Sequence, residues 1–338
     1  MLVAAVVFLI VAASVLAGCR EEPAEGDLTV LRRDSTEVAV APGTAASRSA
    51  TAVRRPPALS RTRAARRTPV VSPVRSSGCG KPFARGETVG EIQWGEGVRT
   101  YLLHVPAGYD PRRAASVVLN FHGYAQTAEQ QEAYSGLVPL ADAKGFVLVT
   151  PEGSGSPRGW AISGVYDDNG VDDVGFVSQL VSQLSDSLCL DARRIYATGH
   201  SNGAEMASQL ACYLPSIIAA AAPVSGAVFQ DCQGAGVPII AFQGTDDWNV
   251  PYEDSAGAVA QWVTHNGCPA EPDVSAPAAG VELRSWKCTN GDVAFYVLDG
   301  VGHVWPGGDP NRGGVGQASD AVNASAVMWE FFRSHPKR

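Results

Sequence analysis

The sequence has few of the features that accompany a bound metal. Its 338 residues include seven cysteines and six histidines, but no Cys-x-x-Cys pair and no cluster of histidines. Protein metal sites, zinc sites above all, draw cysteine, histidine and carboxylate ligands from short, regular spacings. We therefore expect no metal, and no motif in the chain calls for another cofactor.

Positive charge is scarce in the C-terminal three quarters of the chain. From residue 76 onward there are 15 lysines and arginines against 28 aspartates and glutamates, a net charge of −13. Nucleic-acid-binding domains carry the opposite excess, because they neutralise phosphates. The composition therefore argues against nucleic acid as a partner.

The N-terminus is apolar but lacks a preceding lysine or arginine. Residues 1–18 end in small residues just before Cys19, as an export signal does. The run Leu16-Ala17-Gly18-Cys19 is similar to the lipobox of bacterial lipoproteins. We predict a lipoprotein-type signal peptide over 1–18 with Cys19 lipidated; an ordinary cleaved signal and a transmembrane anchor remain alternatives. Each places the remainder outside the cytoplasm, secreted or lipid-anchored, with membrane contact only through the N-terminal lipid.

Residues 20–76 have no apolar period and no acid between Glu37 and Glu87. They are rich in alanine, arginine, serine, threonine and proline, and cannot bury enough apolar surface to offset the entropy lost on ordering. We predict a disordered linker here. A basic strip that lies on anionic lipid or cell wall is the alternative.

Without Cys19 the chain has six cysteines, an even number that suggests up to three disulfides in an exported protein. Cys268 and Cys288 flank a short, loop-like insertion rich in proline and alanine, and we predict that they pair. The sequence leaves open the pairing of the other four, which are Cys79, Cys189, Cys212 and Cys232.

The folded part is expected over 77–338, where strand-like and helix-like segments alternate. The expected strands are 99–105, 116–121, 146–150, 194–198, 218–223, 238–242 and 294–298. The expected helices are 127–144, 174–188, 204–214, 258–265 and 318–334. Such alternation indicates an α/β protein with a mostly parallel central sheet and helices on both faces.

The strongest chemical motif is Gly199-His200-Ser201-Asn202-Gly203, which follows a strand and opens a helix. In that context the glycines permit a sharp turn that exposes the hydroxyl of Ser201 above the sheet, as in α/β-hydrolase enzymes. We predict that Ser201 is a nucleophile. The alternative is a glycine-rich turn whose serine caps the helix.

A serine nucleophile needs a base, and in this fold the triad follows the order Ser, Asp or Glu, His. His303 lies in a glycine-rich loop just after the last expected strand and is the candidate base. The acid should follow the preceding parallel strand, where Asp246 and Asp247 compete; we choose Asp247. The oxyanion would be bound by the backbone N–H groups of Asn202 and Tyr124, with His122 supporting the loop that carries Tyr124.

At this point the chain resembles the poly(3-hydroxybutyrate) depolymerase and feruloyl esterase family of carbohydrate-esterase-like α/β hydrolases. The motifs that carry the resemblance span most of 79–335: His122-Gly123, Thr150-Pro151-Glu152-Gly153 with Trp160, Val171-Asp172-Asp173-Val174-Gly175-Phe176, Arg194 to Ala204, Ala222 to Gly226, Gly244-Thr245-Asp246-Asp247 and Gly302-His303-Val304-Trp305-Pro306-Gly307. The resemblance implies the α/β-hydrolase fold, and its Gly-Thr-x-Asp pattern favours Asp247. The chain departs from the family at Gln243, where a histidine is usual.

We therefore expect an extracellular serine esterase, feruloyl esterase-like or polyhydroxybutyrate depolymerase-like, that acts on a small or polymeric ester and is monomeric. Trp160, Trp248 and Trp305 are candidate substrate contacts, since an aromatic wall would stack on a planar acyl group; loop packing is their alternative role. An acetyl esterase, thioesterase or acyltransferase of the same fold remains possible. A non-catalytic lipoprotein that binds glycans is the alternative from another functional class.

Overall fold

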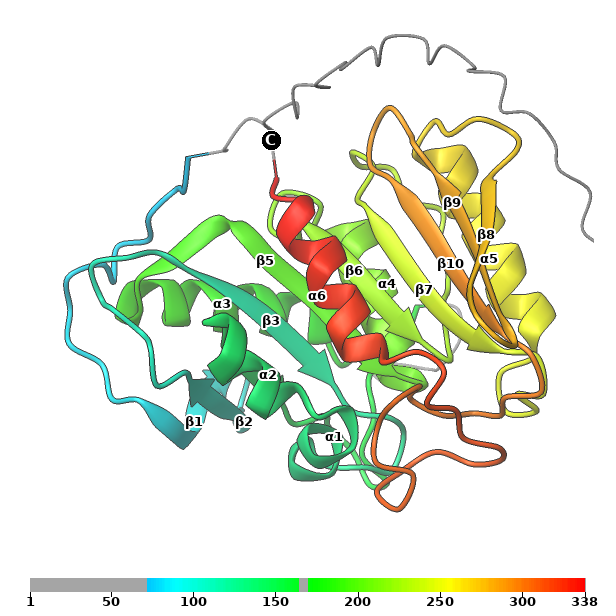
Figure 1. Ribbon diagram of the computed structural model, residues 1–338. Coiled ribbons are helices and arrows are strands. Elements are labelled where there is room, and N and C mark those ends of the chain that lie inside the picture. Colours follow the sequence, from blue (N-terminus) through cyan, green and yellow to red (C-terminus); the bar gives the residue numbers. More distant parts are fainter. Residues whose placement is uncertain (1–71, 164–169, 338) are drawn as a thin grey trace, which may run out of the picture. The chain divides into compact units, whose positions relative to one another are not determined.

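The computed structural model describes residues 72–163 and 170–337, which contain a ten-stranded sheet (Figure 1). Its spatial order is β1-β2-β4-β3-β5-β6-β7-β10-β9-β8. The six central strands, from β4 to β10, pair in parallel, and the two strands at each edge pair antiparallel. The strands are β1 (Gly86–Trp94), β2 (Gly97–Val105), β3 (Ala115–Phe121), β4 (Val147–Pro151), β5 (Leu190–His200), β6 (Ala220–Val224), β7 (Ile239–Gly244), β8 (Asp273–Ala278), β9 (Val281–Trp286) and β10 (Val293–Leu298).

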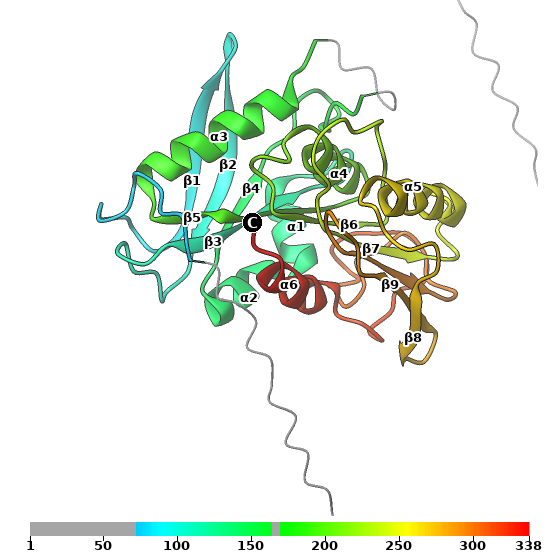
Figure 2. The same ribbon diagram turned by 90° about the horizontal axis from the view of Figure 1, so that it is seen from above.

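Helices cover both faces of the sheet, as Figure 2 shows from above. They are α1 (Ala128–Ser135), α2 (Leu137–Lys144), α3 (Asp173–Ser187), α4 (Asn202–Tyr213), α5 (Tyr252–His265) and α6 (Ala324–Ser334). One apolar core joins the sheet to α3, α4 and α5 around Phe176, Met206 and Trp262. A second core joins the opposite face to α2 and α6 around Leu137 and Phe332. The predicted α/β-hydrolase architecture is confirmed.

The central strands are apolar along their whole length because both faces of the sheet are covered. Every residue of β4, β6 and β7 is buried. Because the central strands run in parallel, the loops that leave their carboxyl ends all emerge on the same side of the molecule, the carboxyl edge of the sheet. In open α/β sheets that edge is where ligands bind.

The helix predicted over 127–144 is wrong in one respect, because it is two helices. Gly136 has φ 64°, a left-handed conformation that ends α1, and its N–H bonds to the carbonyl of Glu132. Thr127 and Gln130 form a capping box at the start of α1. The closing helix is also shorter than the predicted 318–334, since Asn323 caps it by accepting a hydrogen bond from the N–H of Ala326 at 2.8 Å.

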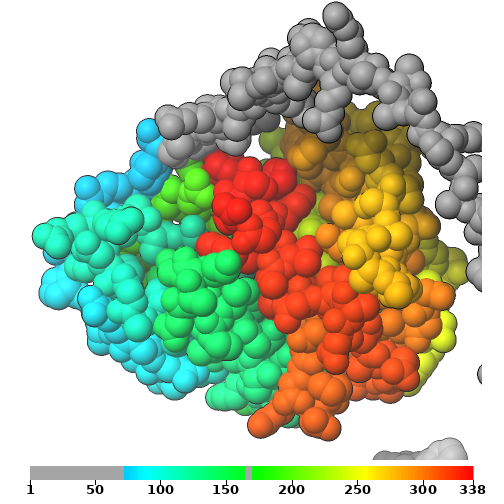
Figure 3. Space-filling view, in the orientation of Figure 1, coloured from blue at the N-terminus to red at the C-terminus, as the bar shows by residue number. Residues whose placement is uncertain are grey.

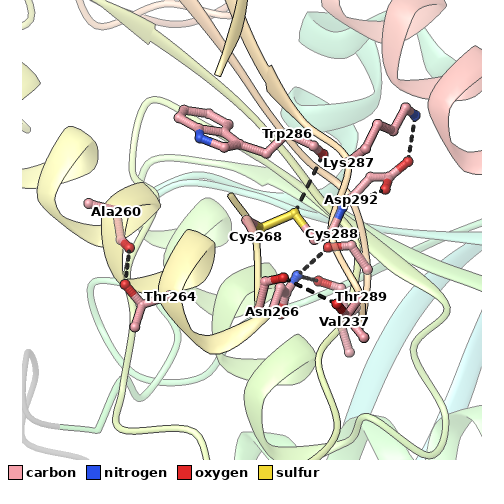
Figure 4. Close-up of a disulfide and its surroundings, with 12 residues drawn as sticks. Val237, Ala260, Thr264, Asn266, Cys268, Trp286, Lys287, Cys288, Thr289 and Asp292 are labelled. Carbon is pink, nitrogen blue, oxygen red and sulfur yellow. Dashed lines mark hydrogen bonds and ion pairs between the residues drawn. A yellow bond between two sulfur atoms is a disulfide. The ribbon is translucent and has the colours of Figure 1, made fainter. Parts of the chain in front are cut away.

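The insertion between Cys268 and Cys288 was expected to be a loop, but it contains the β8–β9 hairpin at the edge of the sheet. The predicted disulfide between these two cysteines is present (Figure 4). Two more disulfides join Cys79 to Cys189 and Cys212 to Cys232. Disulfides are compatible with an exported protein.

The predicted linker boundary at residue 76 is too late. Ser76 donates its N–H to the carbonyl of Leu190 at 3.0 Å, and Val74 donates its N–H to Oδ1 of Asp191 at 2.9 Å. These bonds attach residues 74–76 to the start of β5, so the folded part begins before residue 77. The expected signal, Cys19 and most of the expected linker lie outside the described residues. Within residues 72–163 and 170–337 no helix combines the length and apolarity needed to cross a membrane.

Candidate active site

Ser201 sits in a strained turn between β5 and α4. It has φ 56° and ψ −124°, a conformation that a non-glycine residue adopts only when its surroundings impose it. Its N–H bonds to the carbonyl of Val224, at the end of the neighbouring strand β6, at 3.0 Å. The turn therefore holds the serine at the carboxyl edge of the sheet, half-buried and at the N-terminus of α4.

The two glycines of this turn are required by close backbone packing. A β-carbon at Gly199 would collide with the carbonyl of Gly203, and one at Gly203 would collide with the carbonyl of Phe121. Phe121 ends β3 and precedes the loop that carries Tyr124. The serine turn and that loop therefore lie against one another.

His303 and Asp247 meet at the same edge of the sheet. Nδ1 of His303 lies 2.8 Å from Oδ2 of Asp247, and both side chains are buried. Asp247 also accepts the backbone N–H groups of Asn249 and Val250 through Oδ1, at 3.0 and 2.9 Å. The carboxylate is thus solvated by protein donors, and it fixes the orientation of the imidazole.

Asp246, the competing acid, does not make this contact. Asp246 is exposed, and its carboxylate accepts a hydrogen bond from the hydroxyl of Thr245 at 3.3 Å. Its N–H bonds to the carbonyl of Val301, which joins the two loops through their backbones. The geometry brings Asp247 rather than Asp246 to His303.

The loop of His303 is held from two sides. Backbone bonds run in both directions between His303 and Val315, each 2.8 Å long. The hydroxyl of Ser225, just after β6, donates to the carbonyl of Val304 at 3.0 Å. Figure 3 shows the segment between β10 and α6, in orange and red, at the surface beside the segment of α1 and α2. The imidazole is therefore positioned by a braced loop.

His200, the neighbour of Ser201, packs directly on His303. The centres of the two imidazole rings are 4.7 Å apart, and the ring of Tyr134 meets His200 edge-on at 5.2 Å. Neither ring nitrogen of His200 has a hydrogen-bond partner among the described residues. Burial, and then the nearby His303, lower the pKa of His200 well below the ordinary histidine value. His200 is therefore a neutral packing surface for His303.

His122 supports the loop that follows β3. Its Nδ1 donates to the carbonyl of Gly123 at 2.8 Å, and its Nε2 accepts the N–H of Gly153 at 2.9 Å. Burial lowers the pKa of His122 to about 4, so the ring is neutral near pH 7. The N–H of Gly123 bonds to Oε1 of Gln126 at 2.9 Å, and a β-carbon on Gly123 would come within 3.4 Å of the carbonyl of His200. This loop is therefore fixed beside the serine turn.

Asn202 begins α4, so its N–H has no acceptor within the helix and lies at the positive end of the helix dipole. Its side chain accepts the N–H of Trp160 at 2.7 Å and donates to Oε2 of Glu205 at 3.1 Å. Burial is the main cause that raises the pKa of Glu205 to about 7. Glu205 was not among the predicted site residues, because its contact with Asn202 is formed only in the folded chain.

The three candidate tryptophans differ in exposure. Trp160 and Trp305 are each 2% exposed, and their indole N–H groups bond to the carbonyl of His122 and the hydroxyl of Ser325. Trp248 is 68% exposed beside Asp247. The expectation of direct substrate contact is therefore corrected for Trp160 and Trp305, whose rings pack loops, and remains a prediction for Trp248.

A partly buried ion pair between Arg99 and Asp173, which was not predicted from the sequence, lies near the ring of Trp160. Nη1 of Arg99 is 2.9 Å from Oδ1 of Asp173, whose other oxygen accepts the N–H of Ala161 at 2.8 Å. The guanidinium also lies over the ring of Phe176 at 4.1 Å. The only sign of this ion pair in the sequence was the adjacent acids Asp172 and Asp173 at the start of a predicted helix. In the structure Asp172 caps α3, and Asp173 forms the ion pair with Arg99.

Comparison with known proteins places this chain among esterases. The profile of the family described as Esterase PHB depolymerase matches residues 99–267. Probable feruloyl esterase C of Aspergillus clavatus is 30% identical over 270 residues, covering 77% of this chain and 90% of that protein. Feruloyl esterase D of Neurospora crassa is 30% identical over 281 residues, covering 78% and 91%. Feruloyl esterase B of Piromyces equi is 28% identical over 231 residues, 61% of this chain, and the match spans 42% of its length.

Solved structures show the same fold at lower sequence identity. Acetyl xylan esterase from Aspergillus awamori matches with a TM-score of 0.57 at 17% identity, covering 73% of this chain and 99% of that chain. Thermogutta terrifontis esterase 2 phosphonylated by sarin matches with a TM-score of 0.54 at 15% identity, covering 75% and 96%. At these identities the likeness concerns the fold.

Proposed function

The chain belongs to the esterase PHB depolymerase family, and we propose that it is an extracellular carboxylic ester hydrolase that acts through Ser201, His303 and Asp247. The observation that carries this proposal is the buried contact of 2.8 Å between His303 and Asp247. It lies at the strand edge that also holds the strained turn of Ser201. A buried acid that orients an imidazole is the arrangement that lets histidine act as a general base.

In the proposed reaction, the hydroxyl of Ser201 gives its proton to Nε2 of His303 as its oxygen attacks the ester carbonyl. The alcohol leaves with that proton, and the acyl group stays on Ser201. A water molecule then gives a proton to His303 and attacks the acyl-enzyme, which releases the acid and restores the serine. Asp247 stabilises the imidazolium that forms in each half of the cycle.

The backbone N–H groups of Asn202 and Tyr124 are the proposed donors to the oxyanion. Asn202 supports this role because its N–H lies at the first position of α4. Tyr124 supports it because its loop packs on the serine turn through Gly123 and is braced by His122. Removing one such donor typically costs about 3–4 kcal/mol of transition-state stabilisation.

The proposed substrate is a feruloyl or hydroxyalkanoyl ester, small or polymeric. The names of the relatives support an aromatic acyl group, and Trp248 offers an exposed ring next to Asp247 for stacking on it. The three disulfides support a location outside the cytoplasm. A signal over 1–18, lipidation of Cys19 and a linker that starts at residue 20 and ends before the bonds of Val74 and Ser76 to the start of β5 complete the proposed organisation of the chain, which acts as a monomer.

A substrate panel tests the proposal. Methyl ferulate, hydroxybutyrate oligomers and short acetate esters are compared at equal concentration with the purified protein and with Ser201→Ala. The proposal expects hydrolysis of at least one of the first two, abolished by the substitution. If only acetate esters were hydrolysed, the proposed feruloyl or hydroxyalkanoyl specificity would be wrong. If Ser201→Ala still hydrolysed an ester, Ser201 would not be the nucleophile.

A further inference from the structure

Gln243 contacts the proposed catalytic acid from within the sheet. It is the penultimate residue of β7, it is 1% exposed, and its Nε2 donates to Oδ2 of Asp247 at 2.9 Å. The same nitrogen donates to the carbonyl of Val250 at 2.9 Å. Its Oε1 accepts the hydroxyl of Ser255, on α5, at 2.8 Å. All three polar positions of the amide are therefore used.

These partners determine which way the amide points. Both hydrogens of Nε2 face acceptors, a carboxylate and a carbonyl, while the oxygen faces a hydroxyl that donates. A flipped amide would set its oxygen against the carboxylate of Asp247, and the carbonyl of Val250 would lose the donor that Nε2 provides. Ser255, which is fully buried, thus holds Gln243 in the orientation that donates to Asp247.

The two oxygens of Asp247 are held in different ways. Oδ1 accepts two backbone N–H groups of its own turn, whereas Oδ2 is shared by His303 and Gln243. Without the amide, the imidazole of His303 would be the remaining partner of Oδ2 among the described residues. The carboxyl group would then lose one of the four hydrogen bonds that oppose its rotation.

We propose that Gln243 is a positioning residue of the catalytic acid, which holds Oδ2 of Asp247 toward His303 while Ser255 holds the amide. The inference rests on the proposed function, because it gives Asp247 its catalytic partner. Gln243 acts through Asp247, so its loss slows the chemical step and leaves substrate binding unchanged. Loss of a hydrogen bond to a charged group predicts a decrease in kcat of about 10- to 100-fold.

The test compares Gln243→Met, Gln243→His and Ser255→Ala in the full chain, on one ester that the wild type hydrolyses. Methionine has nearly the volume of glutamine but no donor, whereas histidine keeps a donor. We expect Gln243→Met to lower kcat about 10- to 100-fold with KM changed by less than about twofold. Gln243→His should recover at least about tenfold of that loss, and Ser255→Ala should lower kcat less than Gln243→Met does.

Asn266→Leu is the matched control. Asn266 is a fully buried amide near the opposite end of β7, and its Nδ2 donates to the carbonyls of Val237 and Gly291, each at 2.8 Å (Figure 4). Its substitution removes two amide hydrogen bonds away from the site, so the Tm should fall while kcat stays within about twofold. If Gln243→Met fails to fold, Ser255→Ala carries the test, because it leaves the glutamine in place.

Two results would overturn the inference. One is a kcat for Gln243→Met, or for Ser255→Ala if the former does not fold, within about twofold of the wild type. The other is an equal loss of kcat in Gln243→Met and in Asn266→Leu at equal loss of Tm. Ser201→Ala separates these outcomes from a failure of the proposed function. If Ser201→Ala abolishes turnover while Gln243→Met has no effect, the proposed function stands and only the positioning role of Gln243 is wrong.

Discussion

Nδ1 of His303 lies 2.8 Å from Oδ2 of Asp247, although 56 residues separate them in the chain. The cause is the pairing of β7 with β10, which run in parallel with Gly244 opposite Leu298. Asp247 follows the first strand and His303 the second, so both loops leave the sheet at the same edge. The parallel pairing of these two apolar strands therefore brings the proposed acid and base within hydrogen-bond distance of each other.

His122→Leu should slow catalysis through the loop that carries Tyr124. The variant loses the bonds to Gly123 and Gly153, so the loop is free to move away from the serine turn. We expect kcat to fall about tenfold, less than the loss of a whole oxyanion donor. Since the pKa of His122 is about 4, the effect should be constant between about pH 6 and 9. Steady-state kinetics against His335→Leu, at the C-terminal end, give the comparison; an equal loss in both variants would refute a specific role.

Glu205→Gln should stabilise the protein in mildly alkaline solution. Burial raises the pKa of this carboxyl from 4.5 to about 7 in the folded state, so the folded protein binds more protons than the unfolded chain between those values. The free energy of unfolding of the wild type therefore contains a contribution that falls as pH rises through this interval. Glutamine has no proton to lose, and we expect a gain of up to about 3 kcal/mol at pH 8 and little change at pH 4.5.

Urea unfolding at the two pH values measures this difference. Glu96→Gln, at an exposed turn, is the control and should leave the pH dependence unchanged. A gain in Glu205→Gln that is equal at both pH values would show that ionisation is not its cause.

The three disulfides should differ in how much they raise the free energy of unfolding, because they close loops of different length. Cys79 and Cys189 are 110 residues apart, whereas Cys212–Cys232 and Cys268–Cys288 each span 20. The loss of unfolded-state entropy predicts about 5 kcal/mol for the long loop and about 3 kcal/mol for each short one. Alanine at both cysteines of each pair, followed by urea unfolding, tests the order; a cheaper loss for Cys79–Cys189 would contradict it.

Trp248→Ala should weaken binding of aromatic acyl esters. Its ring is 68% exposed next to Asp247, and stacking on a planar acyl group predicts an increase in KM for methyl ferulate of about 2- to 10-fold. Methyl butyrate should show little change, because it has no ring to stack. Tyr213→Ala, an exposed aromatic at the end of α4, is the control. Equal increases for both esters would argue against stacking.

The sequence could predict the parts of the fold that depend on local pattern. The parallel strands β3 to β7 and β10 are apolar runs because both faces of the sheet are covered. The turn of Ser201 was predictable because its glycines are local signs of close packing: Gly199 packs on Gly203 within the motif, and Gly203 packs on Phe121 of β3. The order of the motifs along the chain was enough to nominate His303 and the pair Asp246 and Asp247, and the Gly-Thr-x-Asp pattern of the resemblance then favoured Asp247.

The remaining features depend on partners distant in sequence. β1 and β8 are mostly exposed edge strands without an apolar run, and each is stabilised by a neighbouring hairpin strand. Trp160 and Trp305 were candidate substrate contacts because nothing local reveals the acceptors of their indole N–H groups, the carbonyl of His122 and the hydroxyl of Ser325. The contact of Gln243 with Asp247 likewise requires Ser255 on α5 to orient the amide.

Mass spectrometry after treatment with a fluorophosphonate tests the central claim most directly. The account predicts one covalent adduct in the native protein, mapped to the peptide that contains Ser201, with no labelling of Ser201→Ala and slower labelling of His303→Ala and Asp247→Asn. An unlabelled native protein, or an adduct that persists in Ser201→Ala, would contradict it.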